Sequence, residues 1–334
     1  MKTIHLEKPG SIDGLVLREH DVPRPAASEV LIRVHANSLN FRDNTIVAGY
    51  WNPGIPKDLI PVSDGAGEVI EVGEGVTRVA AGDRVAGAFY QRWIGGELRK
   101  EYMASDLGGV HHGMLSEYVL LNEAGVVRIP PHLSYEEAAT LPCAGVTAWN
   151  GLIGRQPLSA GETVLIQGSG GVSIFALQMA KLFGARVIAT SSSEEKLDKL
   201  KALGADELID YKRVDWLPEV LRLTDGRGVD LVVEMVGDID KSIQALRIGG
   251  RLSFIGIVSG KIAPLTHLMM PRMNSIHGIS VGSRDDFEAM NRAITLHRLR
   301  PVLDRKFEFP DIQNALQYLQ KGAHVGKVII TYNS

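Results

Sequence analysis

The stretch that constrains the architecture most is residues 163–211, TVLIQGSGGVSIFALQMAKLFGARVIATSSSEEKLDKLKALGADELIDY. An apolar run at residues 163–167 predicts a buried strand, and a glycine turn follows it at residues 168–171. Apolar side chains then recur at helical spacing over residues 172–183, and a second apolar run at residues 186–190 predicts the next strand. The order of strand, glycine turn, helix and strand indicates a βαβ unit of a parallel sheet.

The glycine turn predicts a binding site for a dinucleotide. Glycines without a Cβ let the chain turn tightly and let a pyrophosphate approach the backbone N–H groups at the helix start. The third glycine of the fingerprint is replaced by Ser173, whose side chain is small enough to keep the helix close to the strand. A βαβ unit with a glycine-rich turn and no nucleotide remains the alternative. The residues predicted to hold the pyrophosphate are Gly168, Ser169, Gly170, Gly171 and Val172.

The end of the second strand bears on which dinucleotide binds. NAD-binding units place an Asp or Glu roughly twenty residues after the first glycine, where it holds the ribose 2′-hydroxyl. This sequence has TSSS at residues 190–193 and no carboxylate there. These hydroxyls, with Lys196 and Tyr211 nearby in sequence, favour a 2′-phosphate and therefore NADP over NAD. Against this, Ser192 could form a capping box with Glu195, and the glutamates at 194 and 195 add negative charge.

Size and composition bound the class of protein. A chain of 334 residues is long enough for two domains, each with its own core. The formal net charge is −3 without a block of like charge, so we expect neither nucleic acid nor a membrane as a partner. No segment is apolar enough to cross a bilayer, and a single cysteine excludes an internal disulfide. The composition therefore predicts a soluble, cytoplasmic protein.

The remaining pattern predicts two domains of different kinds. Short strands and glycine turns predict a mainly β domain from residues 1–124, which residues 265–334 rejoin. In residues 125–264 strands alternate with helices, which predicts an α/β domain with a doubly wound parallel sheet. Residues 91–113 predict a long polar loop that could close over a substrate, since loops of this length are usually functional or mobile.

Smaller signals mark individual elements of these domains. The stretch NSLNFRDNTIVAGYW, residues 37–51, predicts a short helix that enters a loop at Gly49, and Ser134 with Glu137 predicts a capping box. After residue 265 we expect loop, followed by a helix at 312–319 and a closing strand at 326–331.

Motifs along almost the whole chain resemble the medium-chain dehydrogenase/reductase superfamily, and most closely its zinc-independent quinone oxidoreductases and enoyl reductases. The resemblance rests on the glycine turn and on NFRD (40–43), GAGEV (65–69), AGDRV (81–85), LPCAGVTA (141–148), LGAD (203–206) and GKVI (326–329). It implies a GroES-like catalytic domain from both chain ends, an inserted Rossmann domain, a cleft between the two and a homodimer formed through the nucleotide domains.

The resemblance also assigns residues to the coenzyme. Ser192, Lys196 and Tyr211 match positions that quinone reductases use around the 2′-phosphate. Thr147 and Lys327 match family positions close to the coenzyme. Three residues at the ends of later strands are expected to flank the nicotinamide: Val236, Gly256 and Ile257.

For the substrate side, the residues expected to face the cleft are Asn40, Asp43, Tyr50 and Asp64. Tyr50 could donate a proton or a hydrogen bond, although an aromatic anchor for its loop is an equally ordinary role. Asn40 and Asp43 could simply cap the local helix and turn. None of these is a committed general acid, so the proton could also come from water.

Zinc-dependent members of the superfamily hold their catalytic metal with two cysteines and a histidine. Here the first cysteine position falls within residues 40–43 and the histidine position at residues 63–64, and neither holds the required residue. Only Cys143 stands at a ligand position, and a structural zinc lobe would need four cysteines. An improvised site from Asp64, Cys143 and His111 or His112 is the alternative, but we predict no metal.

The predicted absence of zinc favours a particular substrate class. Zinc polarises an ordinary carbonyl as a Lewis acid, whereas quinones and α,β-unsaturated carbonyls spread the developing charge by conjugation. The sequence therefore predicts NADPH-dependent hydride transfer to a small quinone or α,β-unsaturated carbonyl compound. The alternatives are a zinc-type alcohol dehydrogenase acting on small alcohols or aldehydes, and a catalytically silent dinucleotide-binding protein.

Overall fold

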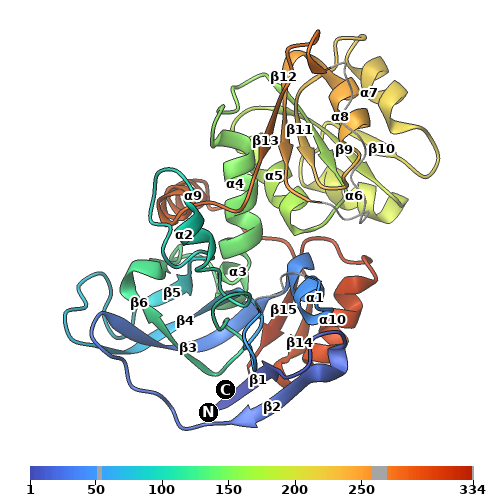
Figure 1. Cartoon of the computed structure of the whole chain (residues 1–334). Helices are drawn as coiled ribbons and strands as arrows, with labels where there is room; N and C mark the ends of the chain where they lie inside the picture. The colour runs from blue at the N-terminus through green and yellow to red at the C-terminus, as the bar shows by residue number, and fades with distance from the viewer. Residues whose placement is uncertain (51–54, 257–268, 333–334) are drawn as a thin grey trace. The chain divides into compact units, whose positions relative to one another are not determined.

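The computed structural model describes residues 1–50, 55–256 and 269–332 (Figure 1). The chain divides into two compact units, one formed by Met1–Val146 with Gly282–Ser334 and the other by Thr147–Val281. Both boundaries lie later in the chain than the predicted ones at 124/125 and 264/265. The difference arises because residues 126–128 pair with the sheet of the first unit, and residues 275–278 pair with the sheet of the second.

The second unit contains a parallel sheet with the strand order β10-β9-β8-β11-β12-β13. Counted along the chain this is the order 3-2-1-4-5-6 of dinucleotide-binding folds, which confirms the predicted doubly wound sheet. The strands β8 and β11 are buried along their whole length, as expected for a sheet with both faces covered. The strands are β8 (Thr163–Gln167), β9 (Arg186–Ser191), β10 (Glu207–Asp210), β11 (Val229–Glu234), β12 (Leu246–Phe254) and β13 (Ser275–Gly278).

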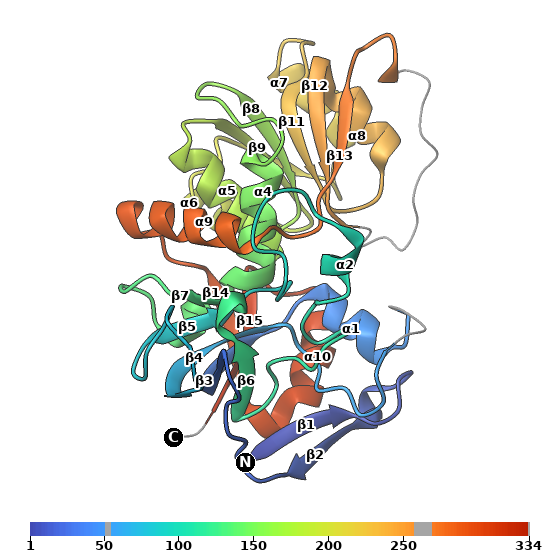
Figure 2. The ribbon, with the colours of Figure 1, turned by 60° about the vertical axis from the view of Figure 1, so that its left-hand side comes forward.

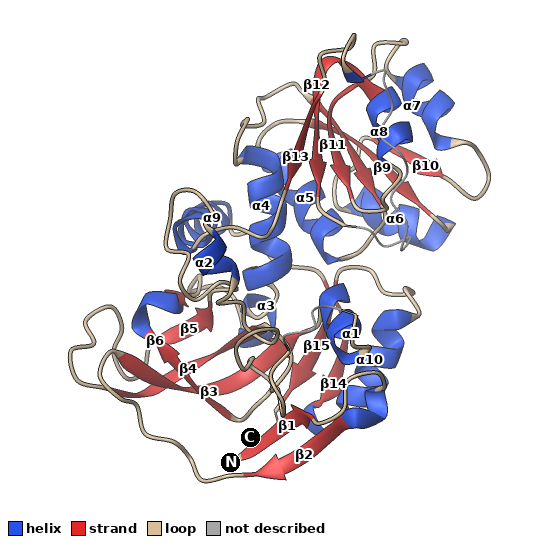
Figure 3. Cartoon of the chain, in the orientation of Figure 1, coloured by secondary structure: helices blue, strands red, loops and turns tan. Residues whose placement is uncertain are grey.

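Helices lie on both sides of this sheet (Figure 3). Val220 of α7 and Ile243 of α8 are fully buried in a core with Leu165 and Val232 of the strands. The strands and helices that alternate along this part of the chain thus bury their apolar faces in one layered core. The helices are α4 (Val146–Ile153), α5 (Gly171–Leu182), α6 (Glu194–Ala202), α7 (Trp216–Leu223) and α8 (Ile239–Ala245).

The first unit is mainly β, as predicted for a GroES-like domain. Its larger sheet has the strand order β14-β15-β3-β4-β5-β7, with β6 paired to β3, and a separate hairpin is formed by β1 and β2. The pairing of β15 with β3 joins the two ends of the chain in one sheet. The strands are β1 (Lys2–Leu6), β2 (Leu15–Glu19), β3 (Glu29–Ser38), β4 (Asp64–Val72), β5 (Arg84–Gly87), β6 (Tyr118–Asn122), β7 (Val126–Arg128), β14 (Leu303–Glu308) and β15 (Lys327–Thr331).

The helices of the first unit include α1 (Phe41–Val47) and α10 (Ile312–Gln320), which lie side by side in Figures 1 and 2 and confirm two predicted helices. The capping box of Ser134 and Glu137 is confirmed at the start of α3 (Tyr135–Ala138). A π-helical turn, η3 (Leu141–Gly145), follows α3. The remaining short elements are α2 (Lys100–Met103) and the 3₁₀ turns η1 (Ile12–Gly14), η2 (Glu123–Gly125) and η5 (Phe309–Asp311).

The sequence reasoning missed the helix α9 (Arg284–His297), because a loop was expected up to residue 312. A local signal for it exists: Ser283 and Asp286 form a capping box, and buried Phe287, Met290 and Ile294 follow at helical spacing.

Part of the predicted polar loop at 91–113 is anchored in the interior. Trp93, Asp106 and Leu107 are buried, and Arg42 of α1 forms an ion pair of 2.5 Å with Asp106. Arg42 also donates a hydrogen bond of 2.9 Å to the carbonyl oxygen of Leu107. The second half of the loop is thereby held to α1. Among the helices in the described ranges, none has the length and apolar character that a membrane span requires.

Candidate functional site

A cluster of buried polar residues lies in the first unit where three strands and a helix meet. Ser38, at the end of β3, pairs with Asp64 at the start of β4 and with Ile329 of β15. This register brings Asp64 and Lys327 to the chain segment that enters α1, whose cap and third residue are Asn40 and Asp43. We call Asn40, Asp43, Asp64, Cys143 and Lys327 the polar cluster.

Lys327 and Asp43 are both tied to Asn40. The Lys327 Nζ donates hydrogen bonds to the Leu39 carbonyl oxygen at 2.6 Å and to Asn40 Oδ1 at 2.5 Å. The backbone N–H of Asn40 donates to Asp43 Oδ2 at 2.7 Å, so Asp43 does cap its helix, as one interpretation of the sequence held. The other oxygen, Asp43 Oδ1, is buried and has no hydrogen-bond partner in the described structure. The helix cap therefore uses only half of this carboxyl group.

Asp64 joins the cluster to the π-helical turn. Its Oδ1 accepts a hydrogen bond of 2.7 Å from the Ser63 hydroxyl, and its Oδ2 accepts one of 3.3 Å from the backbone N–H of Cys143. Asp43 and Asp64 are fully buried, and Lys327 is 3% exposed. Two carboxyl groups and one amine are thus held away from water within one set of contacts.

Burial controls the protonation of these groups. It raises the pKa of Asp43 to about 6, although the Arg42 charge and the Asn40 N–H oppose the rise. Burial likewise raises the pKa of Asp64, opposed mainly by the Lys327 charge, and it lowers the pKa of Lys327, opposed by Asp64. The site therefore contains a carboxyl group, Asp43, that exchanges its proton near neutral pH.

The Cys143 side chain is a protonated thiol at neutral pH in the metal-free chain. The residue as a whole is only half-buried, but desolvation and then the Asp64 charge raise the pKa of its thiol to about 12. The expected zinc ligands are missing around it, since Asn40–Asp43 and Ser63–Asp64 supply no cysteine or histidine. The residues present therefore do not fit a family zinc site.

The alternative metal site from Asp64, Cys143 and a histidine is not formed. The Nδ1 of His112 accepts a hydrogen bond of 3.1 Å from the Ile60 N–H, and its ring centroid lies 6.5 Å from that of His5. Within residues 1–50, 55–256 and 269–332, no three His, Cys, Asp or Glu side chains are close enough to share a metal ion.

Of the four residues predicted for the substrate side, the structure brings Asn40, Asp43 and Asp64 together. Tyr50 is separate, with 84% of its surface exposed. Lys327, which was expected beside the coenzyme, contacts Asn40. Its contact depends on the pairing of β15 with β3, and local sequence contains no signal for it.

The glycine turn in the second unit has the geometry that a phosphate requires. Gly168 has a φ of +79°, a value that favours glycine, and Gly170 caps α5. A Cβ at either position would meet no atom within 4 Å, so the space beside the turn is open. Gly171 and Val172 form the first turn of α5, whose N–H groups have no partners within the helix. These residues fit a bound pyrophosphate.

Two serines flank this turn in different ways. Ser169 is buried. Ser173, at the third glycine position of the fingerprint, donates a hydrogen bond of 2.8 Å from its hydroxyl to the Gln167 carbonyl oxygen. The serine therefore fixes the helix to the strand, where a glycine would only permit close packing.

The predicted capping box of Ser192 and Glu195 is wrong by one residue. Ser193 caps α6 and accepts the N–H of Lys196 at 3.4 Å, because β9 continues through Ser191, which pairs with Asp210. The Ser192 hydroxyl is consequently not used as the cap. No Asp or Glu ends β9.

The acidic residues that follow β9 are paired with basic ones. Glu195 forms an ion pair with Lys199 at 3.0 Å, and Glu194 forms one with Arg213 at 3.4 Å. Tyr211, after β10, is 44% exposed. The negative charge that counted against a phosphate is therefore partly compensated.

A buried network at the ends of β8 and β11 was missed by the sequence reasoning. Glu234, with no exposed surface, accepts hydrogen bonds from the N–H groups of Val236 at 2.7 Å and Gly237 at 2.8 Å. The Ser242 hydroxyl donates to Glu234 and accepts a hydrogen bond of 3.0 Å from Gln167 Nε2. Glu234 thus positions the segment that includes the predicted Val236. An acidic residue within the apolar run VDLVVEMVG was the available signal.

The other predicted coenzyme residues have varied environments. Thr147 is 4% exposed on α4. Gly256 has no room for a side chain, since a Cβ there would lie 2.9 Å from the Met235 carbonyl oxygen. Ile257 lies outside the described residues.

Comparisons with known proteins cover both units. The family described as Alcohol dehydrogenase GroES-like domain matches residues 26–131, and the family described as Zinc-binding dehydrogenase matches residues 171–295. A zinc-type alcohol dehydrogenase-like protein of Schizosaccharomyces pombe is 39% identical over 98% of this chain and 97% of its own. An acryloyl-coenzyme A reductase of Metallosphaera sedula is 32% identical over 96% of this chain and 98% of its own.

A solved structure of an NAD-dependent alcohol dehydrogenase covers all of both chains at 34% identity with a TM-score of 0.91. The fold, the glycine turn and these similarities agree with the resemblance seen in the sequence. The chain therefore belongs to the medium-chain dehydrogenase/reductase superfamily, whose members bind a nicotinamide dinucleotide, and it is an oxidoreductase.

Proposed function

We propose that this protein uses NADPH to reduce a quinone or an α,β-unsaturated carbonyl compound without a catalytic metal ion. The observation that carries the proposal is the polar cluster, which has amine and carboxyl groups where zinc-dependent relatives hold metal ligands. The acryloyl-coenzyme A reductase named above reduces a conjugated acyl group according to its name, which supports the same substrate class.

The cluster supplies what such a reduction needs apart from the hydride, which comes from the bound coenzyme. Negative charge develops on the acceptor oxygen, and a positioned donor or cation stabilises it. A lysine ammonium has three N–H donors, and Lys327 uses two on Leu39 and Asn40. We assign its third N–H to the acceptor oxygen.

Asp43 is the candidate proton donor for the same reaction. A general acid works best when its pKa lies near the working pH, and the pKa of Asp43 is about 6. Its Oδ1 has no other partner among the described residues, while its Oδ2 keeps the hydrogen bond to Asn40. Asp64 holds the local charge that keeps Lys327 protonated. Removing Asp43 would therefore slow protonation more than coenzyme binding.

The preference for NADP rests on the end of β9. Ser192, Lys196 and Tyr211 offer hydroxyls and a cation without a strand-end carboxylate. The similarity to an NAD-dependent enzyme counts the other way, so the preference needs its own test. Lys196→Gln should raise the KM for NADPH about tenfold and leave that for NADH unchanged, through loss of one charge-assisted contact. Lys201→Gln, an exposed lysine on the same helix, is the matched control.

The experiment for the function is NADPH oxidation with a panel of acceptors: a benzoquinone, a cyclic enone, an enoyl thioester and a saturated ketone. We expect turnover with at least one conjugated acceptor and none with the saturated ketone. Asp43→Asn should lower kcat with little change in the dissociation constant for NADPH. Equal turnover of saturated and conjugated ketones would contradict the proposed role of conjugation.

A zinc-type alcohol dehydrogenase is the second candidate, favoured by the names of the matched family and of the yeast relative. If the protein is such an enzyme, it should oxidise small alcohols, and this activity should depend on added zinc. A catalytically silent dinucleotide-binding protein would bind the coenzyme and turn over no acceptor of the panel. We also propose a homodimer formed through the nucleotide-binding unit, which a mass measurement in solution tests.

A further inference from the structure

The buried network at the ends of β8 and β11 reaches a third strand of the second unit. The backbone carbonyl oxygen of Glu234 accepts hydrogen bonds from the N–H groups of Ile255 at 3.0 Å and Gly256 at 3.3 Å, which directly follow β12. On the other side, Oε1 of Gln167, the last residue of β8, accepts the N–H of Met235 at 3.4 Å. The segments that follow β11 and β12 are therefore held to each other and to the end of β8.

Gln167 also connects this network to the glycine turn. It directly precedes Gly168, and its carbonyl oxygen accepts the hydrogen bond from the Ser173 hydroxyl. Its Nε2 donates to Ser242, whose hydroxyl donates to Glu234. Gln167 is 5% exposed, and Ser242 and Glu234 have no exposed surface. Buried hydrogen bonds of this kind fix one arrangement of the groups they join, so the segment after β11 is tied to the phosphate-binding turn.

The strand order shows which half of a dinucleotide meets this segment. The order reverses between β8 and β11, and ligands of such sheets bind beyond the carboxyl ends of the strands at this point. The pyrophosphate belongs at the glycine turn after β8, and the adenosine ribose belongs at the end of β9, on one side of β8. The nicotinamide half therefore extends to the other side of β8, over the residues that follow β11.

Val236 presents an apolar surface among these residues. It is 39% exposed, whereas its neighbour Gly237 is buried. The backbone on both sides of its Cα is held, because Glu234 accepts the N–H groups of Val236 and Gly237. An exposed apolar side chain on a fixed backbone is preorganised to pack against a flat ring, since binding need not order it.

We propose that Gln167, Ser242 and Glu234 position Val236 and Gly237 for the nicotinamide half of the coenzyme. The three side chains act through the backbone that they hold, so they are positioning residues and not catalytic ones. The proposal requires only that the chain binds a nicotinamide dinucleotide. It does not depend on the hydride acceptor or on whether a metal ion takes part.

The experiment measures how much the nicotinamide half adds to the affinity. Calorimetry on the whole chain gives the dissociation constants of NADPH and NADH, and those of 2′-phospho-ADP-ribose and ADP-ribose, which lack the nicotinamide. Each coenzyme is compared with its own truncated form, so the result is independent of which coenzyme binds more tightly. We expect the parent to bind the complete coenzyme more tightly than the truncated form.

Variants of the network should reduce this difference. Glu234→Ala should weaken binding of the complete coenzyme about tenfold and leave the truncated form unchanged, since the segment after β11 loses its acceptor. Ser242→Ala removes one hydroxyl and should cost about threefold in the same way. Glu234→Gln should restore most of the affinity, because its amide oxygen still accepts both N–H groups. Amide hydrogen exchange at residues 235–237 should be faster in Glu234→Ala than in Glu234→Gln.

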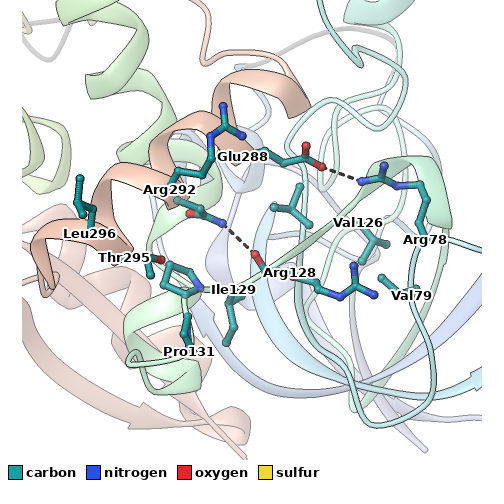
Figure 4. Close-up of a pocket in the computed structure, with 13 residues that line it drawn as sticks. Arg78, Val79, Val126, Arg128, Ile129, Pro131, Glu288, Arg292, Thr295 and Leu296 are labelled. Atoms are coloured by element: carbon teal, nitrogen blue, oxygen red, sulfur yellow. Dashed lines mark hydrogen bonds and ion pairs between the residues drawn. The ribbon is translucent and has the colours of Figure 1, made fainter.

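Two controls separate this effect from a loss of stability. Asp230 is a buried carboxyl group near the amino end of the same strand, and it accepts the N–H of Thr163 at 2.8 Å. Asp230→Ala should destabilise the second unit and leave the difference between the two forms unchanged. In the first unit, Glu288→Gln breaks the ion pair of 2.7 Å with Arg78 that Figure 4 shows as a dashed line, and it should also leave the difference unchanged.

Three results would overturn the proposal. The first is equal weakening of complete and truncated coenzymes by Glu234→Ala and Ser242→Ala, which indicates a general loss of structure. The second is binding of the complete coenzyme by both variants as tightly as by the parent. The third is the same selective loss in Asp230→Ala. If Glu234→Ala does not fold, Ser242→Ala provides the same comparison.

Discussion

Replacing Asp43 with asparagine should remove a specific dependence of stability on pH. The ordinary pKa of this carboxyl group is 3.8, and burial raises it to about 6 in the folded chain. The folded chain therefore keeps a proton between about pH 4 and pH 6 that the unfolded chain releases, so stability falls as the pH rises through this interval. The difference between the pKa values of the folded and unfolded chain corresponds to about 3 kcal/mol of lost stability at pH 7, since one pKa unit is worth about 1.4 kcal/mol.

The amide introduced by Asp43→Asn does not titrate in this pH range. The stability of this variant should therefore not fall between about pH 4 and pH 6. The new amide N–H at the place of Oδ1 has its own cost, because that position has no partner in the described structure. The slope with pH is therefore the diagnostic quantity, rather than the stability at one pH. Relative to the parent, the variant should gain about 3 kcal/mol between pH 4 and pH 7.

The assay must report on the first unit alone, because a chain with two units need not unfold in one step. Met114 is fully buried in a core of that unit. Peroxide can oxidise it only when that unit unfolds, so the extent of its oxidation at increasing urea concentration measures the unfolding of the first unit. Asp21→Asn, at an exposed aspartate of the same unit, is the matched control. Parallel slopes for the parent and Asp43→Asn would refute the argument that burial perturbs Asp43.

Three further predictions concern stability and coenzyme binding. Arg42→Met should destabilise the first unit by about 3–5 kcal/mol in urea, because it leaves a buried carboxylate unpaired, whereas Arg18→Met at an exposed pair should change the stability far less. Gly168→Ala and Gly161→Ala should each cost about 1–2 kcal/mol at their positive φ, but only the first should weaken coenzyme binding, measured by calorimetry. Glu234→Ala should destabilise the second unit by about 3 kcal/mol, since three donors lose their buried acceptor, and equal stability of parent and variant in thermal unfolding would contradict this.

Local signals were sufficient for much of the fold. The strand β8 and the helix α5 were predictable because a buried strand, a glycine turn and an amphipathic helix each leave a pattern within a few residues. The helix α9 has comparable signals, but they lie beside a proline- and methionine-containing stretch that itself favours loop. The start of α6 was misplaced by one residue because several serines in a row can each act as a cap.

The polar cluster shows what local patterns cannot supply. Asn40 and Asp64 were singled out by motif, but the contact of Lys327 with Leu39 joins residues 288 positions apart. That contact exists only because β15 pairs with β3, and strand pairing over such a separation is set by the whole sheet. The pKa of Asp43 has the same origin, since burial is a property of the assembled unit.

The most direct test of the account is the acceptor assay on protein from which metals have been removed by chelation and dialysis. The metal-depleted protein should still oxidise NADPH with a conjugated carbonyl or quinone, and added zinc should not increase the rate. Activity that disappears on chelation and returns in proportion to bound zinc would contradict it.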